Sequence, residues 1–257
     1  MKKIFGRIRL SMINQSKFGK YIGYAFGEII LVVIGILIAL QINNWNENRK
    51  SKHELDRIYL SIIDEIDNDV QILNEYLPIF EWKVNTQTRI LSGAYSAEDW
   101  ITNDSLYRSF SSYPDFAISQ EKSNLLKTKV ALDDETRALN NRIADFYNKY
   151  TVDIDIKTRE AFTSFHRNYA YWEEHEEWFF EAFWQEKFDK LSLYATRSPI
   201  FKNKIGFFNA LLRRLYLALD SYRKDAISLQ KEIESYLIIH RDMENPSTYY
   251  TNQNEAK

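Results

Sequence analysis

The sequence predicts an all-α protein with one N-terminal transmembrane helix followed by an antiparallel helical bundle of about four main helices. Glycine is scarce, because only Gly93 and Gly206 follow residue 36 among the seven glycines of the chain. Hairpin-rich β structure needs turn glycines, so their scarcity argues against that class. Apolar residues instead recur at alternating steps of three and four, the spacing of helices in bundles. An unbroken apolar run from Ile29 to Leu40 marks the membrane segment.

The first expected helix covers residues 21–45 and is long enough to cross a bilayer. It rises about 36 Å, whereas the hydrocarbon layer is roughly 30 Å thick. Tyr21 and Tyr24 at one end and Trp45 at the other are residue types of membrane interfaces. Because no small-residue cleavage site follows Leu40, an uncleaved signal-anchor is favoured over a cleaved secretory signal. A buried helix of a soluble protein is the third interpretation.

Charge on the two sides of this segment predicts its orientation. Residues 46–257 hold more acidic than basic residues, and the whole chain has a formal net charge of −2. We therefore expect a periplasmic helical bundle at 46–242, a disordered tail at 243–257 and no nucleic-acid partner. Residues 1–20 contain no acidic residue and are predicted to be cytoplasmic. The basic residues expected there to contact anionic lipid are Lys2, Lys3, Arg7, Arg9, Lys17 and Lys20.

Small residues within the membrane segment predict that it associates with another helix. Gly23, Gly27, Gly35 and Ala39 fall on one ladder of four-residue steps that only Leu31 interrupts, and small residues at this spacing let helix backbones approach closely. Glu28 lies beside this ladder, and an ionisable residue at membrane depth is a candidate for a helix–helix contact. An alternative is that Glu28 lies near the cytoplasmic interface and extends toward water.

A second long helix is expected to continue from the membrane segment, because residues 43–50 contain neither proline nor glycine. Pro78 is expected to kink this helix or to end it near Leu77. Its predicted buried face consists of nine apolar residues: Leu55, Tyr59, Ile62, Ile66, Val70, Leu73, Leu77, Phe80 and Val84.

Less regular segments are predicted to follow. Residues 92–102 are interpreted as a connector, and a short helix is expected at 104–112 with Asn103 or Asp104 as its cap. Residues 119–150 are predicted to form one or two helices, with Asp133 as a cap.

Two further long helices complete the predicted bundle. Residues 153–194 are expected to form an aromatic helix. Residues 199–241 are expected to form another, which begins at Ser198 with Pro199 in its first turn. The predicted apolar seam of this last helix repeats every 3.5 residues and consists of Phe201, Ile205, Phe208, Leu212, Leu215, Leu219, Tyr222, Ala226, Leu229, Ile233 and Tyr236.

The segment 172–186, WEEHEEWFFEAFWQE, combines glutamates, one histidine and large aromatic residues. On a continuous helix Glu174, Glu177 and Glu181 would share one face, and carboxylates with His175 suit a divalent metal. However, the Glu-x-x-His pattern of di-iron bundles is missing, since a tryptophan stands three residues before the histidine. We therefore interpret the segment as an amphipathic helix with aromatic residues in the core and glutamates in water, and we predict no metal or cofactor.

Catalytic motifs are missing from the sequence, so we predict that the protein is not an enzyme. It contains no cysteine, which excludes thiolate nucleophiles and cysteine-bound zinc. It also contains no G-x-S-x-G elbow and no phosphate-binding glycine loop.

The membrane segment and its flanks resemble a known family. The similarity is strongest over Gly27–Lys50, GEIILVVIGILIALQINNWNENRK, which follows basic residues and the run GKYIGYAF. This stretch resembles the start of an uncharacterised Bacteroidota family of single-span membrane proteins with a domain of unknown function, and a looser likeness covers residues 123–147. The resemblance implies no activity, cofactor or partner. It implies a shared segment that includes Glu28, Gln41, Asn43, Asn44 and Trp45.

Two functions are consistent with these features. The first is a non-catalytic interaction or scaffold protein, anchored in the inner membrane, which binds a protein partner or a second copy of itself. The alternative is a ligand-sensing helical domain that signals through a membrane partner, because about twenty cytoplasmic residues are too few for an output domain. A scaffold should have a filled core and an exposed apolar or aromatic patch, whereas a sensor should have a ligand-filled cavity between its helices.

Overall fold

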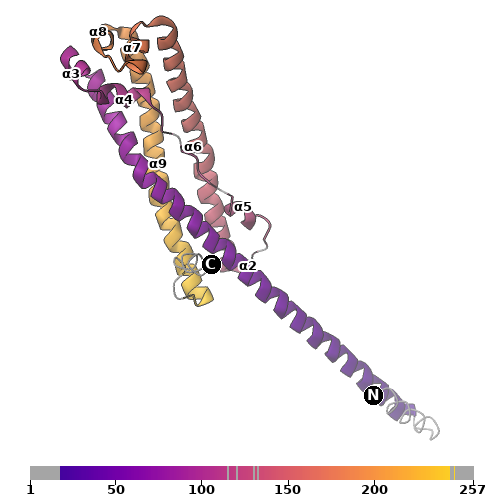
Figure 1. Ribbon diagram of the computed structural model, residues 1–257. Helices are drawn as coiled ribbons and strands as arrows, with labels where there is room; N and C mark the ends of the chain where they lie inside the picture. Colours follow the sequence, from indigo (N-terminus) through magenta and orange to yellow (C-terminus); the bar gives the residue numbers. More distant parts are fainter. Residues whose placement is uncertain are drawn as a thin grey trace. The chain divides into compact units, whose positions relative to one another are not determined.

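The computed structural model describes residues 18–114, 116–119, 121–129, 131, 133–243 and 246, with side chains from residue 22 onward. These residues form helices and no strand, which confirms the predicted all-α class (Figure 1). The chain divides into two units, Met1–Glu54 and Leu55–Lys257. The helices are α2 (Phe18–Leu91), α3 (Ala97–Thr102), α4 (Ser105–Ser111), α5 (Ser123–Leu126), α6 (Asp134–His175), α7 (Trp178–Trp184), α8 (Asp189–Arg197) and α9 (Pro199–Arg241).

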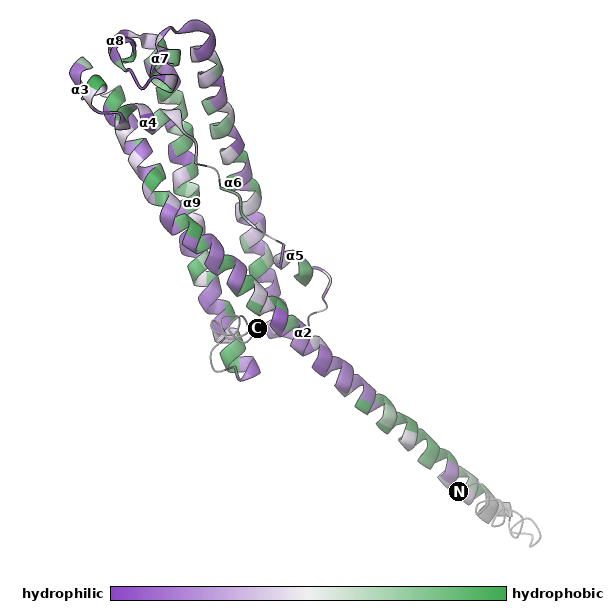
Figure 2. Cartoon of the chain, viewed as in Figure 1, coloured by the Kyte–Doolittle hydropathy of each residue, from purple (hydrophilic) through white to green (hydrophobic). Residues whose placement is uncertain are grey.

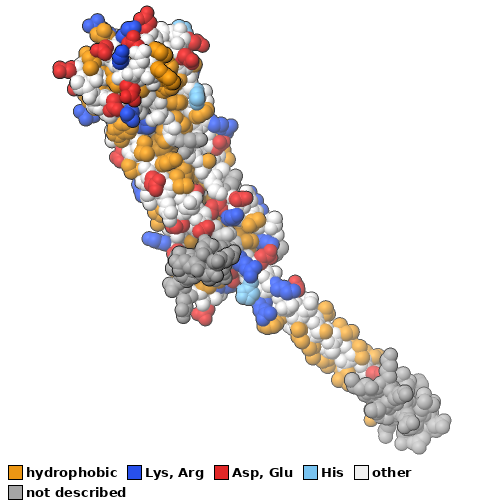
Figure 3. Space-filling view, viewed as in Figure 1, with side chains coloured by type: hydrophobic (Ala, Val, Ile, Leu, Met, Phe, Trp, Pro, Cys, Tyr) orange, Lys and Arg blue, Asp and Glu red, His pale blue; other side chains and the backbone are white. Residues whose placement is uncertain are grey.

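The first unit contains the N-terminal part of α2, and the large apolar side chains of its described residues are exposed. From Ile22 to Ile42 the large apolar side chains are between 45% and 67% exposed. They form a continuous hydrophobic stretch along the helix (Figures 2 and 3). The helix is long and apolar enough to cross a membrane.

The second unit is built on three long helical segments, which are α2 from Leu55 onward, α6 and α9. Helix α9 runs antiparallel to α2: Arg241 near its end donates to Asp56, whereas Asn209 near its start donates to the Val84 carbonyl. These two contacts join the first part of one segment to the last part of the other.

Helix α9 is also antiparallel to α6. The hydroxyls of Thr136 and Tyr236 are 2.8 Å apart, and near the other ends Asn168 donates to the Lys204 carbonyl. Since α2 and α6 both run antiparallel to α9, they run parallel to each other. The described residues between α2 and α6 therefore cross back along the bundle, and they include α3, α4 and α5 (Figure 1). This crossover replaces the direct connections between antiparallel neighbours that the predicted antiparallel bundle implies.

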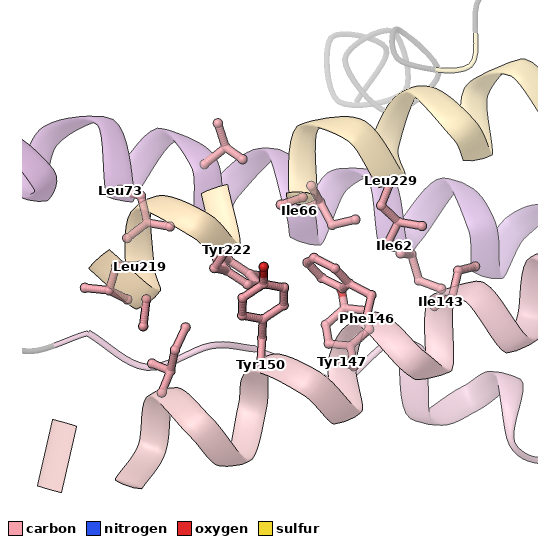
Figure 4. Packing of buried hydrophobic residues seen from close by; sticks show 14 of the residues in the cluster. Ile62, Ile66, Leu73, Ile143, Phe146, Tyr147, Tyr150, Leu219, Tyr222 and Leu229 are labelled. Atoms are coloured by element: carbon pink, nitrogen blue, oxygen red, sulfur yellow. The ribbon is translucent and has the colours of Figure 1, made fainter. Parts of the chain in front are cut away.

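The core lies between the three long segments and has the side chains that the sequence predicts. All nine residues of the α2 stripe are at most 9% exposed, and all eleven of the α9 seam are at most 8% exposed. Figure 4 shows Phe146, Tyr147 and Tyr150 of α6 packing among residues of α2 and α9. The ring of Tyr222 lies 5.2 Å from that of Phe146, so aromatic residues fill the centre.

The expected kink or end of the second helix at Pro78 is wrong, since α2 continues through Pro78 to Leu91. The proline lies on the exposed side of the helix, where water can reach the carbonyl that loses its hydrogen bond. On the other side Leu77, Phe80 and Val84 are buried. Their burial keeps the helix in register on both sides of the proline.

The predicted boundaries of the two middle helices are also wrong. We expected helices at 119–150 and 153–194, but α6 runs without a break from Asp134 to His175. Tyr150 and Ile154 are both buried one turn apart, which holds this helix together across the expected boundary. Beyond His175 the chain forms two short helices, α7 and α8. The bundle therefore has three long helical segments rather than four.

Two predicted helix caps are confirmed. The side chains of Asp133 and Ser198 accept hydrogen bonds from the backbone N–H of Thr136 and Phe201, respectively. The expected connector at 92–102 instead contains α3, which begins with a capping box formed by Ser96 and Asp99. That pair was the sequence signal for the missed helix.

Lys83 fixes the crossover to α2. Its side chain is 2% exposed, and its Nζ donates to the carbonyl oxygens of Arg108, Ser109 and Ser112 at 2.9–3.3 Å. Burial lowers the pKa of Lys83 to about 8. The ammonium group satisfies carbonyls at the C-terminal end of α4, where a positive charge is favourable. The crossover is thus attached to the long helix by a buried polar contact.

Asp69 makes a buried hydrogen bond that should affect stability as the pH changes. It is 3% exposed, and the Tyr222 hydroxyl donates to it at 2.5 Å. Burial raises the pKa of Asp69 to about 6, and the nearby Glu65 carboxylate adds to the rise. The folded state therefore binds this proton more tightly than the unfolded state. The resulting stabilisation is complete below the unfolded pKa of about 4 and is lost as the pH rises through 6.

The Asp69→Asn variant is expected to remove this dependence, since asparagine still accepts from Tyr222 and carries no charge. Between pH 4 and pH 7 the difference in free energy of unfolding between variant and parent should change by about 2 kcal/mol in favour of the variant. Urea titrations at several pH values measure it. Asp225→Asn is the control, because hydrogen bonds from Tyr150 and Lys149 lower the pKa of Asp225. For this variant the difference in free energy of unfolding should change with rising pH in favour of the parent. A difference for Asp69→Asn that does not change with pH would contradict this account.

Candidate functional site

A second core, rich in aromatic residues, closes the end of the bundle where α2 finishes. The ring of Trp172, at the end of α6, lies 5.4 Å from Phe110 and 5.5 Å from Trp178. Both tryptophans are at most 2% exposed. Aromatic pairs at these distances stabilise a structure beyond their burial alone. Trp178 therefore fixes the start of α7 on the bundle.

The other side of α7 carries aromatic residues that the bundle does not cover. Phe180 is 61% exposed, Phe183 54% and Trp184 74%. Phe183 stacks on Phe179 with a ring separation of 5.5 Å and an interplanar angle of 6°. Large exposed aromatic residues that gather in one place are typical of interaction surfaces.

These rings form one wall of an open cleft, which we call the acidic-aromatic cleft. Its volume is about 650 Å³. The other wall is the end of α6 and the turn that follows it. The lining residues include four glutamates and no lysine or arginine: Glu173, Glu174, His175, Glu176, Glu177, Phe179, Phe180, Phe183 and Trp184.

The glutamates are arranged differently from what we expected. Since α6 ends at His175, the residues Glu174, Glu177 and Glu181 do not share one helix face, and that prediction is wrong. Glu177 and Glu181 instead meet at Lys190 of α8, with N–O distances of 3.3 and 2.9 Å. These hydrogen bonds raise the pKa of Lys190. The lysine thus holds α8 against α7.

The end of α6 has an unusual charge for a helix C-terminus. Glu173 and Glu174 lie in its last turn, and Glu176 is the C-cap residue. The exposed carbonyls there already carry a partial negative charge, so basic residues are favoured at that position. The basic residue in this turn is His175, whose ring stacks on Tyr171 at 4.6 Å. The cleft therefore concentrates negative charge at a position where it destabilises the helix.

Within the described part of the chain no group of three or more His, Cys, Asp or Glu residues lies close enough to hold a metal ion. From the sequence, we expected the aromatic residues of segment 172–186 to lie in the core. Trp172 and Trp178 are buried as expected, whereas Phe180, Phe183 and Trp184 are not.

A second open cleft lies between α6 and α9 and has the opposite charge. Its volume is about 560 Å³, and its lining includes Arg159, Arg167 and Arg214 together with one acidic residue, Glu160. Phe207 in this cleft is 52% exposed and lies under the Arg167 guanidinium at 5.5 Å. This cleft therefore presents an exposed aromatic ring beside arginines, whereas the acidic-aromatic cleft presents exposed rings beside glutamates.

The predicted membrane-segment residues lie on the exposed surface of α2. Tyr24 is 65% and Trp45 63% exposed, and the Arg49 guanidinium lies 5.3 Å from the Trp45 ring. A methyl group added at Gly23, Gly27 or Gly35 would meet no atom within 4 Å. The ladder that these glycines form with Ala39, beside Glu28, is therefore open to a neighbouring helix, and its association stays a prediction.

Some predicted residues fall outside the part of the chain that the structure describes. These are Lys2, Lys3, Arg7, Arg9 and Lys17 of the basic segment, the side chains of Lys20 and Tyr21, and most of the tail at 243–257.

Comparison with known proteins identifies one domain. A DUF6090 domain of unknown function covers residues 28–154. This match confirms the predicted likeness to a family with a domain of unknown function. No curated protein and no solved structure matches the chain.

The DUF6090 match ends inside α6, before the acidic-aromatic cleft. It includes α2 from Glu28 onward, the crossover and the first half of α6. Helix α9, which supplies one of the three sides of the core, lies beyond it. The folded unit is therefore larger than the matched region.

Proposed function

We propose that this protein is a non-catalytic interaction protein, which is anchored in the inner membrane by α2 and binds another protein through the acidic-aromatic cleft. The N-terminus lies in the cytoplasm, and the bundle lies in the periplasm. The exposed cluster of Phe180, Phe183 and Trp184 is the observation that carries the proposal.

The apolar part of α2 supports membrane anchoring. Its side chains from Ile22 to Ile42 are exposed, and burying them in lipid removes a large apolar surface from water. Tyr24 and Trp45 lie where the two membrane interfaces would be. The basic residues that precede the segment favour a cytoplasmic N-terminus.

The bundle supports partner binding rather than ligand sensing. Buried side chains fill the positions between the three long helices, including Phe146, Tyr150 and Tyr222 (Figure 4). The acidic-aromatic cleft lies instead at the surface of the bundle end. A filled centre with an exposed aromatic patch is the arrangement that distinguishes a scaffold from a sensor.

Site-specific photocrosslinking tests this function in intact cells. We expect a photoreactive phenylalanine analogue at position 180 or 184 of the full chain to give one adduct of defined mass. The same analogue at position 207, where the natural phenylalanine is similarly exposed, is the matched control and should not give this adduct.

The adduct should also disappear when Phe183→Ser is added, because the stacked pair with Phe179 shapes the cleft wall. Failure to crosslink at 180 and 184, or equal adducts at all three positions, would overturn the proposed function.

A further inference from the structure

We propose that the partner segment bound in the acidic-aromatic cleft is cationic and amphipathic, with lysine or arginine side chains beside apolar residues. This inference rests on the proposed function, because it names the chemistry of the partner that the cleft binds. It depends on three separate observations: the charge of the lining residues, the position of the glutamates and the exposure of the aromatic rings.

The charge of the lining is strongly one-sided. Four of the nine lining residues are glutamates, and none is lysine or arginine. Lys190 pairs with Glu177 from outside the lining. The remaining carboxylates at Glu173, Glu174 and Glu176 give the cleft a negative potential, which attracts cations and repels acidic partners.

The position of these glutamates is unfavourable for the isolated fold. Glu173 and Glu174 lie in the last turn of α6, where the helix dipole favours positive charge. Natural proteins break such local rules mainly at functional sites. The first turn of the same helix follows the rule, since Asp134 and Glu135 lie there. A bound cation would remove the unfavourable interaction at the C-terminal end.

The aromatic rings explain why the partner must also be apolar. Phe180, Phe183 and Trp184 expose ring surface beside the carboxylates. Lysine and arginine have apolar stems that pack on rings, and their charged ends are attracted to ring faces and to carboxylates. Apolar neighbours in the partner would cover the rest of the ring surface. An acidic segment would be repelled by the glutamates, and a purely polar segment would leave the ring surface exposed to water.

Binding of defined peptides to the full chain in zwitterionic detergent tests the inference. The probe is a short fluorescein-labelled peptide of lysine, leucine and tyrosine. The control peptide has the same sequence with glutamate in place of each lysine. Fluorescence anisotropy should show binding of the lysine peptide only, weakened by added salt. Trp184→Ala should abolish it.

The charge variants make the test specific. Glu173→Gln with Glu174→Gln should weaken binding roughly tenfold and should raise the thermal midpoint by about 2 °C, because the dipole is no longer opposed. Glu135→Gln in the first turn of α6 is the control. It should lower the midpoint slightly and leave binding unchanged.

The outcomes separate this inference from the proposed function. If both peptides bind equally, or if the double glutamine variant keeps its affinity, the inference is overturned. If neither peptide binds while crosslinks at 180 and 184 persist, the inference falls and the proposed function stands. If the crosslinks are missing as well, both fall.

Discussion

Replacing Arg241 by methionine is expected to lower the free energy of unfolding of the bundle by about 3–5 kcal/mol. Arg241 donates to Asp56 at 2.9 Å, and both side chains are 8% exposed. Its second nitrogen donates to the Tyr236 hydroxyl at 2.9 Å. Methionine fills similar space but removes the ion pair between Arg241 and the buried Asp56 carboxylate. Urea unfolding followed by circular dichroism measures the loss.

A double variant distinguishes the buried charge from simple loss of packing. Adding Asp56→Leu to Arg241→Met removes the charge that was left buried, so most of the lost stability should return. If the double variant is as unstable as Arg241→Met alone, packing of the arginine stem, rather than the ion pair, stabilises this end of the bundle.

If α2 spans the membrane as we propose, two arginines in its apolar segment should prevent its insertion. Each arginine near the centre of a membrane helix costs about 2.5–3.5 kcal/mol for insertion, so Val33→Arg with Leu37→Arg costs about 6 kcal/mol. The equilibrium constant for insertion should fall by roughly four orders of magnitude. Carbonate extraction after synthesis in the presence of inner-membrane vesicles measures the fraction that remains inserted.

The control exchanges one apolar residue for another, as Val33→Leu with Leu37→Val, and should leave insertion unchanged. Val33 and Leu37 are both about half exposed, so neither variant should change unfolding of the bundle itself. Retention of the arginine variant after carbonate extraction would contradict the membrane assignment of α2.

The long helices could be predicted from the sequence because their patterns repeat many times. The α9 seam contains eleven apolar positions in regular steps, and Ser198 with Pro199 marks its start, so both its bounds and its buried face are confirmed. The α2 stripe was predicted for the same reason. The expected effect of Pro78 was wrong because the helix hydrogen bond that it removes lies on the exposed side, where water can replace it. Burial of the apolar stripe on the other side stabilises the helix by more than this loss.

The bundle end could not be predicted because tertiary contacts decide it. No glycine or proline marks the end of α6 at His175, and Glu186 adopts a left-handed conformation with φ 53°. A continuous helix would place Phe179 on the face of Trp172. The break at Glu176 buries Trp178 instead and turns Phe180 and Trp184 outward. Periodicity alone also cannot tell a direct connection from a crossover, so the parallel arrangement of α2 and α6 was missed.

The regular seam of α9 restricts how the length of this helix can change between relatives. Loss of one residue would turn everything beyond it by about 100° and move the buried stripe toward water. Loss or gain of seven residues returns the stripe almost to its original direction. Homologues should therefore differ in this helix by whole heptads, matched by equal changes in α2 and α6.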